Sequence, residues 1–179
     1  MSETEESGPL AGVRMIEFGQ LLAGPYCASL MGDFGAEVIK VEAPPKGDPM
    51  REWGRERVND RTLWWPALAR NKKVVTLNLR DPEGQELALQ LMEKADVALE
   101  NFSPGTMEKW GLGFEDVLSK QFPRLIHCRV SGFGGEGPLG GFPGYDAVLQ
   151  AMVGLMSING TENSGPTRLR PDCSARWAE

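Results

Sequence analysis

The segment VRMIEFGQLLAGPYCASLMGDFGAEVIKVE, residues 13–42, carries the pattern that decides the fold. Residues 13–18 form a short apolar-rich run that ends at Gly19, and residues 37–42 alternate apolar and charged side chains as a strand does. Between them, residues 25–34 place apolar side chains at helical spacing and begin with a proline, which is favoured in the first turn of a helix. The sequence therefore predicts a strand, a helix and a second strand.

Strand-like and helix-like segments continue to alternate downstream. Asp81 precedes a proline and an acid, a typical helix start, and the helix that follows carries Leu87, Leu91 and Met92 on one face. Strands joined by helices through short turns indicate a parallel sheet. We therefore expect an α/β fold, a Rossmann-like open parallel sheet with helices on both faces. The other predicted elements are strands at 74–79, 96–100 and 124–130, a short helix at 107–110, and a long polar loop over residues 43–60.

The composition suits one globular domain. Of the 179 residues, 41% are hydrophobic and 25% are charged, which leaves enough apolar material for a core. Residues 1–8 are acidic and polar and are predicted to form a disordered tail. Residues 9–169 are predicted to form the main domain. Residues 170–179 follow neither a strand nor a helix period and are predicted to be an atypical tail.

Charge and residue counts narrow the class of partner. A net charge of -6 and a pI near 5.0 argue against a nucleic acid or an anionic membrane as the main partner. Three cysteines and one histidine are too few and too irregularly spaced for a disulfide framework or a zinc site, so we expect no bound metal and a cytoplasmic location. No stretch approaches ~20 uninterrupted apolar residues, and the acidic start is unlike a targeting signal.

Four loops that follow predicted strands are the candidates for a ligand site. Because the carboxyl ends of parallel strands meet at one edge of a sheet, residues 19–25, 42–48, 101–105 and 131–137 are expected to line one rim. The first loop lacks G-x-G-x-x-G spacing, so a nicotinamide fingerprint is not supported. Its Gly-Pro pair, at a helix start, either offers N–H groups to a phosphate or forms a simple tight turn.

Two short groups of residues suit a nucleotide ligand. Arg70, Lys72 and Lys73 bring positive charge together in an acidic chain, and either meet phosphates or form a solvated edge. Asn101 and Phe102 offer an amide and a ring, the combination an adenine needs, although a strand-end turn with a core phenylalanine explains them equally well.

The histidine and the cysteines are interpreted as structural residues. His127 alternates within a predicted strand, and a histidine there is more often a satisfied sheet residue than a base. Cys27 and Cys128 lie in apolar settings, whereas a nucleophilic thiolate needs an electropositive and partly exposed site.

Three long segments, taken together, resemble the family III CoA-transferases, which include formyl-CoA and carnitine CoA-transferases and the α-methylacyl-CoA racemases. The order and near-gapless spacing of these segments cover residues 10–169, which is far more specific than any single motif. The segments are LAGPYCASLMGDFGAEVIKVEAPPKGDPMREWG, ARNKKVVTLNLRDPEGQELALQLMEKADVALENFSPGTMEKWGLGFEDV and PRLIHCRVSGFGGEGPLGGFPGYDAVLQAMVGLMSINGT.

The resemblance implies a Rossmann-like large domain that binds CoA, in longer chains that form interlocked homodimers. It implies acyl-CoA and a carboxylic acid as substrates, with no permanently bound cofactor. Ala43 departs from the formyl-CoA branch, which has an arginine there, so that phosphate contact is expected either to be weaker or to come from Lys46. The residues that fall where the family contacts CoA are Leu22, Ala23, Arg70, Asn71, Lys72, Lys73, Asn101, Phe102 and Lys109.

The resemblance also implies a catalytic carboxylate. In the transferase branch an aspartate attacks the acyl-CoA thioester, and that aspartate falls at Asn163, an amide and a poor nucleophile. Its neighbour Glu162 and the more distant Asp146 are therefore the candidates. Asp146 matches an acid/base aspartate of the racemase branch, with Tyr145 in place of the histidine that precedes it there. A helix-capping role for Asp146 is the structural alternative.

The sequence thus predicts a CoA-transferase that moves CoA from an acyl-CoA to a carboxylic acid through an enzyme-bound carboxylate. Two alternatives remain: a non-catalytic CoA-binding fragment, and a 2-methylacyl-CoA racemase or epimerase. Racemisation is disfavoured because the chain has no second histidine for two-base proton transfer. The residues after Leu169 depart from the family pattern, and this suggests a shortened product.

Overall fold

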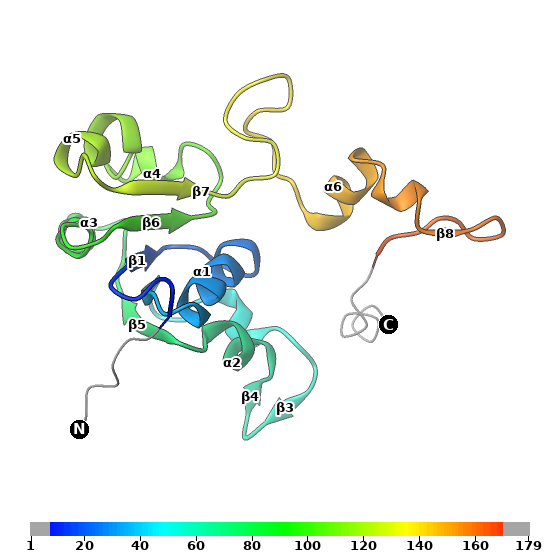
Figure 1. Cartoon of the computed structure of the whole chain (residues 1–179), viewed down its shortest axis with the longest axis horizontal. Coiled ribbons are helices and arrows are strands. Elements are labelled where there is room, and N and C mark those ends of the chain that lie inside the picture. Colours follow the sequence, from blue (N-terminus) through cyan, green and yellow to red (C-terminus); the bar gives the residue numbers. More distant parts are fainter. Residues whose placement is uncertain (1–7, 170–179) are drawn as a thin grey trace. The chain divides into compact units, whose positions relative to one another are not determined.

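A computed structural model describes residues 8–169 of the chain (Figure 1). The chain folds into two compact units, one up to Val130 and one from Ser131 onward. We describe each unit by itself. The predicted domain and tail boundaries stay predictions, and the predicted tail at residues 170–179 lies outside the described residues.

The first unit contains a five-stranded parallel sheet with strand order β5-β2-β1-β6-β7. Numbered along the chain, this order is 3-2-1-4-5, the arrangement of a Rossmann-type sheet. The predicted fold class is confirmed. The strands are β1 (Arg14–Glu17), β2 (Glu37–Glu42), β5 (Lys72–Thr76), β6 (Val97–Glu100) and β7 (Ile126–Arg129).

Helices cover both faces of this sheet. Successive side chains of a strand point to opposite faces, and both faces carry apolar side chains that a helix buries. Met15 and Leu99 pack with Ala28 of helix α1 (Ala23–Asp33) on one face. Ile16 belongs to the cluster of the other face, which includes Ala88 of helix α3 (Pro82–Met92). The remaining elements of this unit are η1 (Pro49–Glu52), β3 (Arg57–Val58), β4 (Arg61–Thr62), α2 (Trp64–Ala69), α4 (Thr106–Lys109), the π-helical turn η2 (Phe114–Leu118) and α5 (Ser119–Gln121).

The structure differs from the predicted elements near the site, and the predicted loop over residues 43–60 contains η1 and β3. Strand β5 begins at Lys72, because its ladder with β2 pairs Lys72 with Val38, so both lysines belong to the strand and not to the turn before it. Asp81 occupies the N-cap position of α3 as predicted, but its side chain accepts from Asn78 Nδ2 and not from a helix N–H.

The second unit has little core of its own. It consists of α6 (Asp146–Met152), η3 (Leu155–Ser157) and a hairpin of β8 (Gly160–Thr161) and β9 (Gly165–Pro166). Two glycines let its loop close on itself, since a Cβ on Gly132 would lie 2.3 Å from the Gly144 Cα. Gln150 is the only buried residue among residues 131–169. The exposed large apolar side chains are Leu139, Phe142, Tyr145, Val148, Met152, Val153, Ile158 and Leu169.

Among residues 8–169, none of the helices has both the length and the apolar character needed to cross a bilayer.

Leu99, fully buried in β6, tests whether the first unit's core carries the stability of the chain. We expect Leu99→Ala to lower the free energy of unfolding by ~2–5 kcal/mol, through lost transfer energy and the cavity left behind. Urea denaturation followed by tryptophan fluorescence measures this loss. Ile126→Ala is the matched control, because that side chain is 63% exposed on the edge strand β7 and its loss should cost under ~1 kcal/mol. Equal losses for the two variants would contradict the placement of the core.

Candidate functional site

The candidate site is a recess at the carboxyl edge of the sheet, beside the point where the strand order reverses. The chain runs from β1 outward to β2 and β5, and then returns to place β6 on the other side of β1. The loops that follow β1 and β6 therefore diverge, and such a switch point is where open α/β sheets bind ligands. The recess is lined by Phe18, Gln20, Val41, Ala43, Leu77, Asn78, Leu79, Arg80, Phe102 and Trp110.

Asn101 clamps the loop after β1 to the loop after β6. Its Oδ1 accepts a hydrogen bond from the Gln20 N–H at 2.7 Å, and its Nδ2 donates to the Gln20 carbonyl at 2.9 Å. Gly19 and Gly24 make room for this amide, since a Cβ on Gly19 would lie 3.2 Å from both the Asn101 Oδ1 and the Gly24 Cα. The amide expected to read an adenine is thus engaged by backbone, and its visible role is to fix the loop.

Four charged side chains lie buried under this loop, and we call them the buried charge cluster: Glu17, Lys40, Asp48 and Lys72. Each side chain is at most 1% exposed. Lys40 Nζ lies 2.7 Å from Glu17 Oε1 and 2.9 Å from Asp48 Oδ2, and Lys72 Nζ lies 2.8 Å from Glu17 Oε2. Because each ammonium has a carboxylate partner, the cluster avoids the large cost of an unpaired buried charge.

Lys72 lies inside the protein and not on its surface. Its Nζ donates to the Pro25 carbonyl at 2.6 Å in addition to its ion pair. Burial lowers the pKa of Lys72 from its usual value, and the attraction of Glu17 opposes this shift. In this arrangement the Lys72 ammonium does not contact a ligand phosphate as predicted, because the side chain has no exposed surface.

An aromatic pair forms one wall of the recess. The Phe102 and Trp110 rings meet edge to face, with centroids 5.1 Å apart and planes at 77°. The Arg80 guanidinium lies 6.0 Å from the Trp110 centroid. A ring wall beside a cation suits a flat base that carries phosphates. Sequence reasoning singled out Phe102 and missed Arg80, in the loop before α3, and Trp110, at the C-cap of α4.

Glu100 holds the backbone of Phe102, which belongs to the aromatic wall. Its Oε2 accepts from the Phe102 N–H at 2.7 Å, and its Oε1 is paired with the Arg129 guanidinium. Burial raises the pKa of Glu100 above its usual range, although Arg129 and the Phe102 N–H oppose the shift.

His127 lies in the interior beside Glu100, as a sheet residue. Its ring stacks on Phe114 with centroids 5.2 Å apart, and its Nε2 is 3.8 Å from Glu100 Oε1, beyond hydrogen-bond reach. Burial lowers the pKa of His127 from 6.5, and the positive charge of Arg129 adds to this effect.

The remaining residues predicted to contact the ligand lie on the surface. Leu22 and Ala23 are exposed where α1 begins, and Lys109 is exposed at the end of α4. Arg70 and Asn71 both bond the Asp33 carboxylate, and Arg70 lowers the pKa of that carboxyl. Lys73, on the opposite face of β5 from Lys72, pairs with Glu37. The two adjacent lysines thus have different environments.

The polar loop expected over residues 43–60 is ordered by charge contacts that the sequence did not reveal. Arg51 donates through Nε to Glu42 Oε2 at 2.8 Å, and its guanidinium lies 3.7 Å from the centre of the Trp65 ring. Asp48, in the same loop, accepts from the Leu21 N–H at 3.0 Å and from the Met50 N–H at 2.8 Å. The loop is therefore tied both to helix α2 and to the loop after β1.

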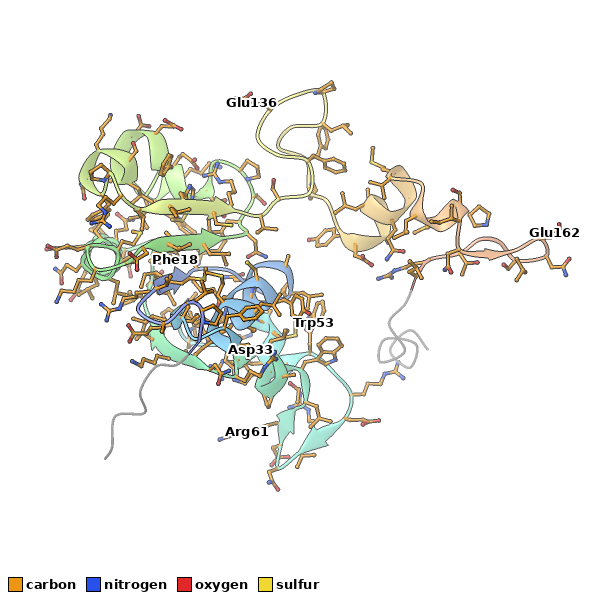
Figure 2. The ribbon with its side chains drawn as sticks, viewed as in Figure 1. Phe18, Asp33, Trp53, Arg61, Glu136 and Glu162 are labelled. Atoms are coloured by element: carbon orange, nitrogen blue, oxygen red, sulfur yellow. The ribbon has the colours of Figure 1, made fainter. Side chains whose placement is uncertain are left out.

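The two candidate catalytic carboxylates belong to the second unit. Asp146 is the first residue of α6 and not its N-cap, and it is bonded by Gln150 Nε2 at 3.0 Å and by Arg168 Nη2 at 2.9 Å. A capping role for Asp146 is therefore wrong. Glu162 lies in the exposed turn between β8 and β9 (Figure 2). No hydrogen bond or ion pair of the described residues joins these two carboxylates.

Neither described cysteine has the surroundings of a nucleophile. Cys27 and Cys128 are free thiols, and burial raises the pKa of Cys128. Within residues 8–169, His, Cys, Asp and Glu side chains do not gather into groups that could hold a metal ion.

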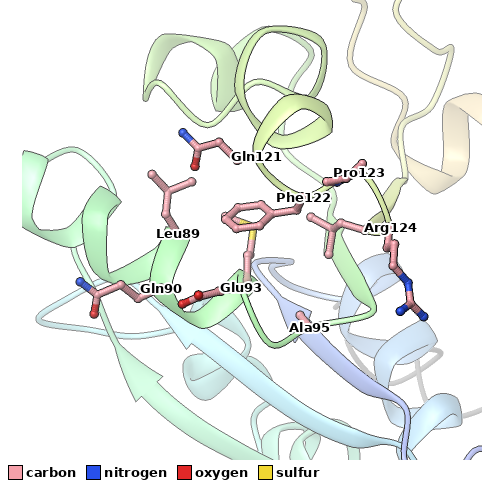
Figure 3. A pocket seen from close by; sticks show the side chains of 10 residues that line it. Leu89, Gln90, Glu93, Ala95, Gln121, Phe122, Pro123 and Arg124 are labelled. Atoms are coloured by element: carbon pink, nitrogen blue, oxygen red, sulfur yellow. The ribbon is translucent and has the colours of Figure 1, made fainter.

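A larger hollow of about 490 Å³ lies at the opposite edge of the sheet, between the end of α3 and the chain that leads from α5 into β7 (Figure 3). Leu89, Phe122 and Arg124 are among the residues that line it. It exceeds the recess in size, but it lies at the amino ends of the strands, where sheets of this type do not bind their ligands. Position therefore favours the smaller recess.

The sequence matches the family described as CoA-transferase family III over residues 10–174. This chain belongs to that family. Succinyl-CoA--D-citramalate CoA-transferase of Chloroflexus aurantiacus is 54% identical over 169 residues, which are 94% of this chain and 42% of that protein. The Succinyl-CoA--L-malate CoA-transferase beta subunit of the same organism is 46% identical over 166 residues, 93% of this chain and 41% of that protein.

A solved structure agrees with the family assignment. A CAIB/BAIF family protein from Brucella suis superimposes with a TM-score of 0.84 at 38% identity, over 90% of this chain and 43% of that one. The chain spans about two fifths of the length of the relatives it matches.

The single histidine makes a site-specific pH test possible. In the window between the lowered pKa of His127 and 6.5, the unfolded chain binds more protons at this residue than the folded chain, so the contribution of His127 to the free energy of unfolding rises with pH and levels off above 6.5. Glu100, whose pKa is raised, contributes the opposite slope, so the test compares two chains. Urea denaturation between about pH 5 and 7 should show that the stability of the unmodified chain relative to His127→Phe, which keeps a ring against Phe114, rises with pH. An NMR titration of the ring that gave a midpoint at or above 6.5 would contradict the buried placement.

Proposed function

We propose that this chain binds coenzyme A through the recess at the switch point, as part of a CoA-transferase that moves CoA from an acyl-CoA to a carboxylic acid. The observation that carries the proposal is the recess itself, where the Phe102–Trp110 wall and Arg80 stand beside a loop whose backbone is held in place by Asn101. The family membership and the names of the relatives agree with it.

The chemistry of each part of CoA suggests where it would lie. The adenine would pack against Phe102, since any base has a face that stacks on an aromatic ring. The recess measures about 40 Å³, so it admits the edge of a ring and leaves the rest of the nucleotide over the surrounding loops. Arg80 would meet a phosphate, and Leu22 and Ala23 present the first turn of α1, whose N–H groups favour negative charge.

The proposed transfer passes through an enzyme carboxylate. A carboxylate oxygen attacks the thioester carbonyl carbon and expels the CoA thiolate, which leaves a mixed anhydride. The thiolate then attacks the enzyme's acyl carbon, releases the first acid and leaves an enzyme-bound CoA thioester. The acceptor carboxylate attacks the carbonyl of that thioester and expels the CoA thiolate, which leaves a second mixed anhydride. The thiolate then attacks the acceptor's acyl carbon and displaces the enzyme carboxylate, which is restored. Glycine N–H groups suit the developing oxyanions.

Asp146 and Glu162 remain the proposed carboxylates for this chemistry. Asp146 is 61% exposed, so a thioester can reach its carboxylate, and Arg168 Nη2 lies 2.9 Å from its Oδ2. Hydroxylamine trapping of an acyl-enzyme would support a transferase, whereas exchange of the substrate's α-proton with deuterium would support the racemase alternative. CoA binding with neither reaction would support a binding role alone.

A homodimeric assembly and a cytoplasmic location stay predictions. The exposed apolar side chains of α6 and its neighbours, such as Val148 and Met152, are what a subunit interface or further chain would cover.

CoA binding to the 179-residue chain, measured by isothermal titration calorimetry, tests the proposed site. We expect Phe102→Ala to weaken binding about tenfold or more, because stacking on a base is worth ~1–3 kcal/mol. Phe122→Ala is the control, since this phenylalanine lines the hollow at the opposite edge. If Phe122→Ala weakens binding and Phe102→Ala does not, the site is misplaced. If the unmodified chain shows no binding of CoA, the proposed function fails.

A further inference from the structure

We propose that Lys72 is a positioning residue, which holds residues 19–25 in their ligand-binding conformation before any ligand arrives. The inference rests on the proposed CoA site, because that loop forms one side of the recess. It assigns to Lys72 a role different from a direct contact with a phosphate, and it extends that role to the buried charge cluster as a whole.

The cluster lies on one face of three neighbouring strands. Glu17 pairs in register with Lys40 across β1 and β2, and Lys72 pairs with Val38, two residues before Lys40. Since residues two apart share a face, Glu17, Lys40 and Lys72 all point to the side of the sheet that α1 covers. Charges replace apolar side chains on this part of the face, directly beneath the start of α1.

The cluster contacts the loop at three backbone groups. Lys40 Nζ donates to the Gly19 carbonyl at 2.8 Å, Lys72 Nζ donates to the Pro25 carbonyl at 2.6 Å, and Asp48 Oδ1 accepts from the Leu21 N–H at 3.0 Å. Asn101 holds both backbone groups of Gln20 between them. Side chains of the cluster and Asn101 therefore hold the backbone at both ends of this segment, at residues 19–21 and at Pro25.

One residue of this loop has a backbone conformation that needs such support. Leu21 has φ of 61°, in the left-handed region that costs free energy for a residue with a side chain. Its N–H is the group held by Asp48. Strain of this kind persists where the surroundings over-determine it, and here the cluster and the Asn101 clamp do so.

A preformed loop raises affinity, because the ligand need not select a rare conformation. We expect Lys72→Met, which removes the bond to Pro25, to weaken CoA binding to the full chain about tenfold or more. Lys73→Met is the matched control, because it alters the adjacent lysine, which is 71% exposed and pairs with Glu37 on the other side of the strand. That control should bind CoA as the unmodified chain does.

A second variant separates positioning from stability, since Lys72→Met leaves two buried carboxylates, Glu17 and Asp48, with the single ammonium of Lys40 and lowers stability. Glu17→Gln combined with Lys72→Met leaves Lys40 paired with Asp48 and restores the charge balance, so the melting temperature should recover while CoA binding stays weak. If CoA binding recovers together with the melting temperature, Lys72 acts on stability alone and the inference is overturned.

Hydrogen exchange in the unmodified chain tests the preformed loop without any variant. We expect the Gln20 and Leu21 amides, bonded to Asn101 and Asp48, to exchange as slowly as sheet amides when no ligand is present. Exchange at the rate of an unfolded chain would overturn the inference. This outcome is distinct from a chain that keeps the amides protected and fails to bind CoA, which would contradict the proposed function and leave the preformed loop standing.

Discussion

The ion pair between Lys72 and Glu17 is the contact on which the candidate site depends. A buried ammonium or carboxylate without a partner costs several kcal/mol, and these two residues meet only because β1 and β5 each pair in register with β2 between them. Lys40 lies between them and contacts Glu17 and Asp48 as well. These ion pairs therefore connect β1, β2 and β5 to the loop after β2. The buried charge cluster that they form lies beneath residues 19–25.

The two loops at the switch point are held by different means. The loop after β1 is held by the buried charge cluster and by Asn101, whereas the loop after β6 is held by Glu100 through the Phe102 N–H. Both sets of contacts approach from the interior. The outer surface of the loops is consequently left for a ligand, which explains why residues predicted to bind it, such as Asn101 and Lys72, are engaged with backbone.

The sequence predicted the strands of the sheet and the fold class, because hydrophobic period and Gly-Pro turns depend on local residues. It did not predict which way Lys72 points. The strand was predicted to begin with the apolar run at Val74, whereas its ladder with β2 starts two residues earlier. Alternation in residues 37–42 would by itself leave Lys40 toward water, but helices cover both faces and bury it. Arg80 and Trp110 join the recess only through tertiary packing, which no local pattern encodes.

The family relationship extends over nearly the whole chain but over only about two fifths of its relatives. Residues 8–169 contain a five-stranded parallel sheet with its recess, and a second unit whose apolar side chains are mostly exposed. The proposed division of labour follows from this contrast: nucleotide recognition belongs to the first unit, and the candidate carboxylates Asp146 and Glu162 belong to the second.

A crystal structure of the 179-residue chain with coenzyme A tests the central claim most directly. The account predicts density for the adenine against Phe102, with a phosphate near Arg80 and residues 19–25 unchanged from the free chain. Density for the adenine in the hollow between α3 and α5, with the recess at the switch point empty, would contradict it.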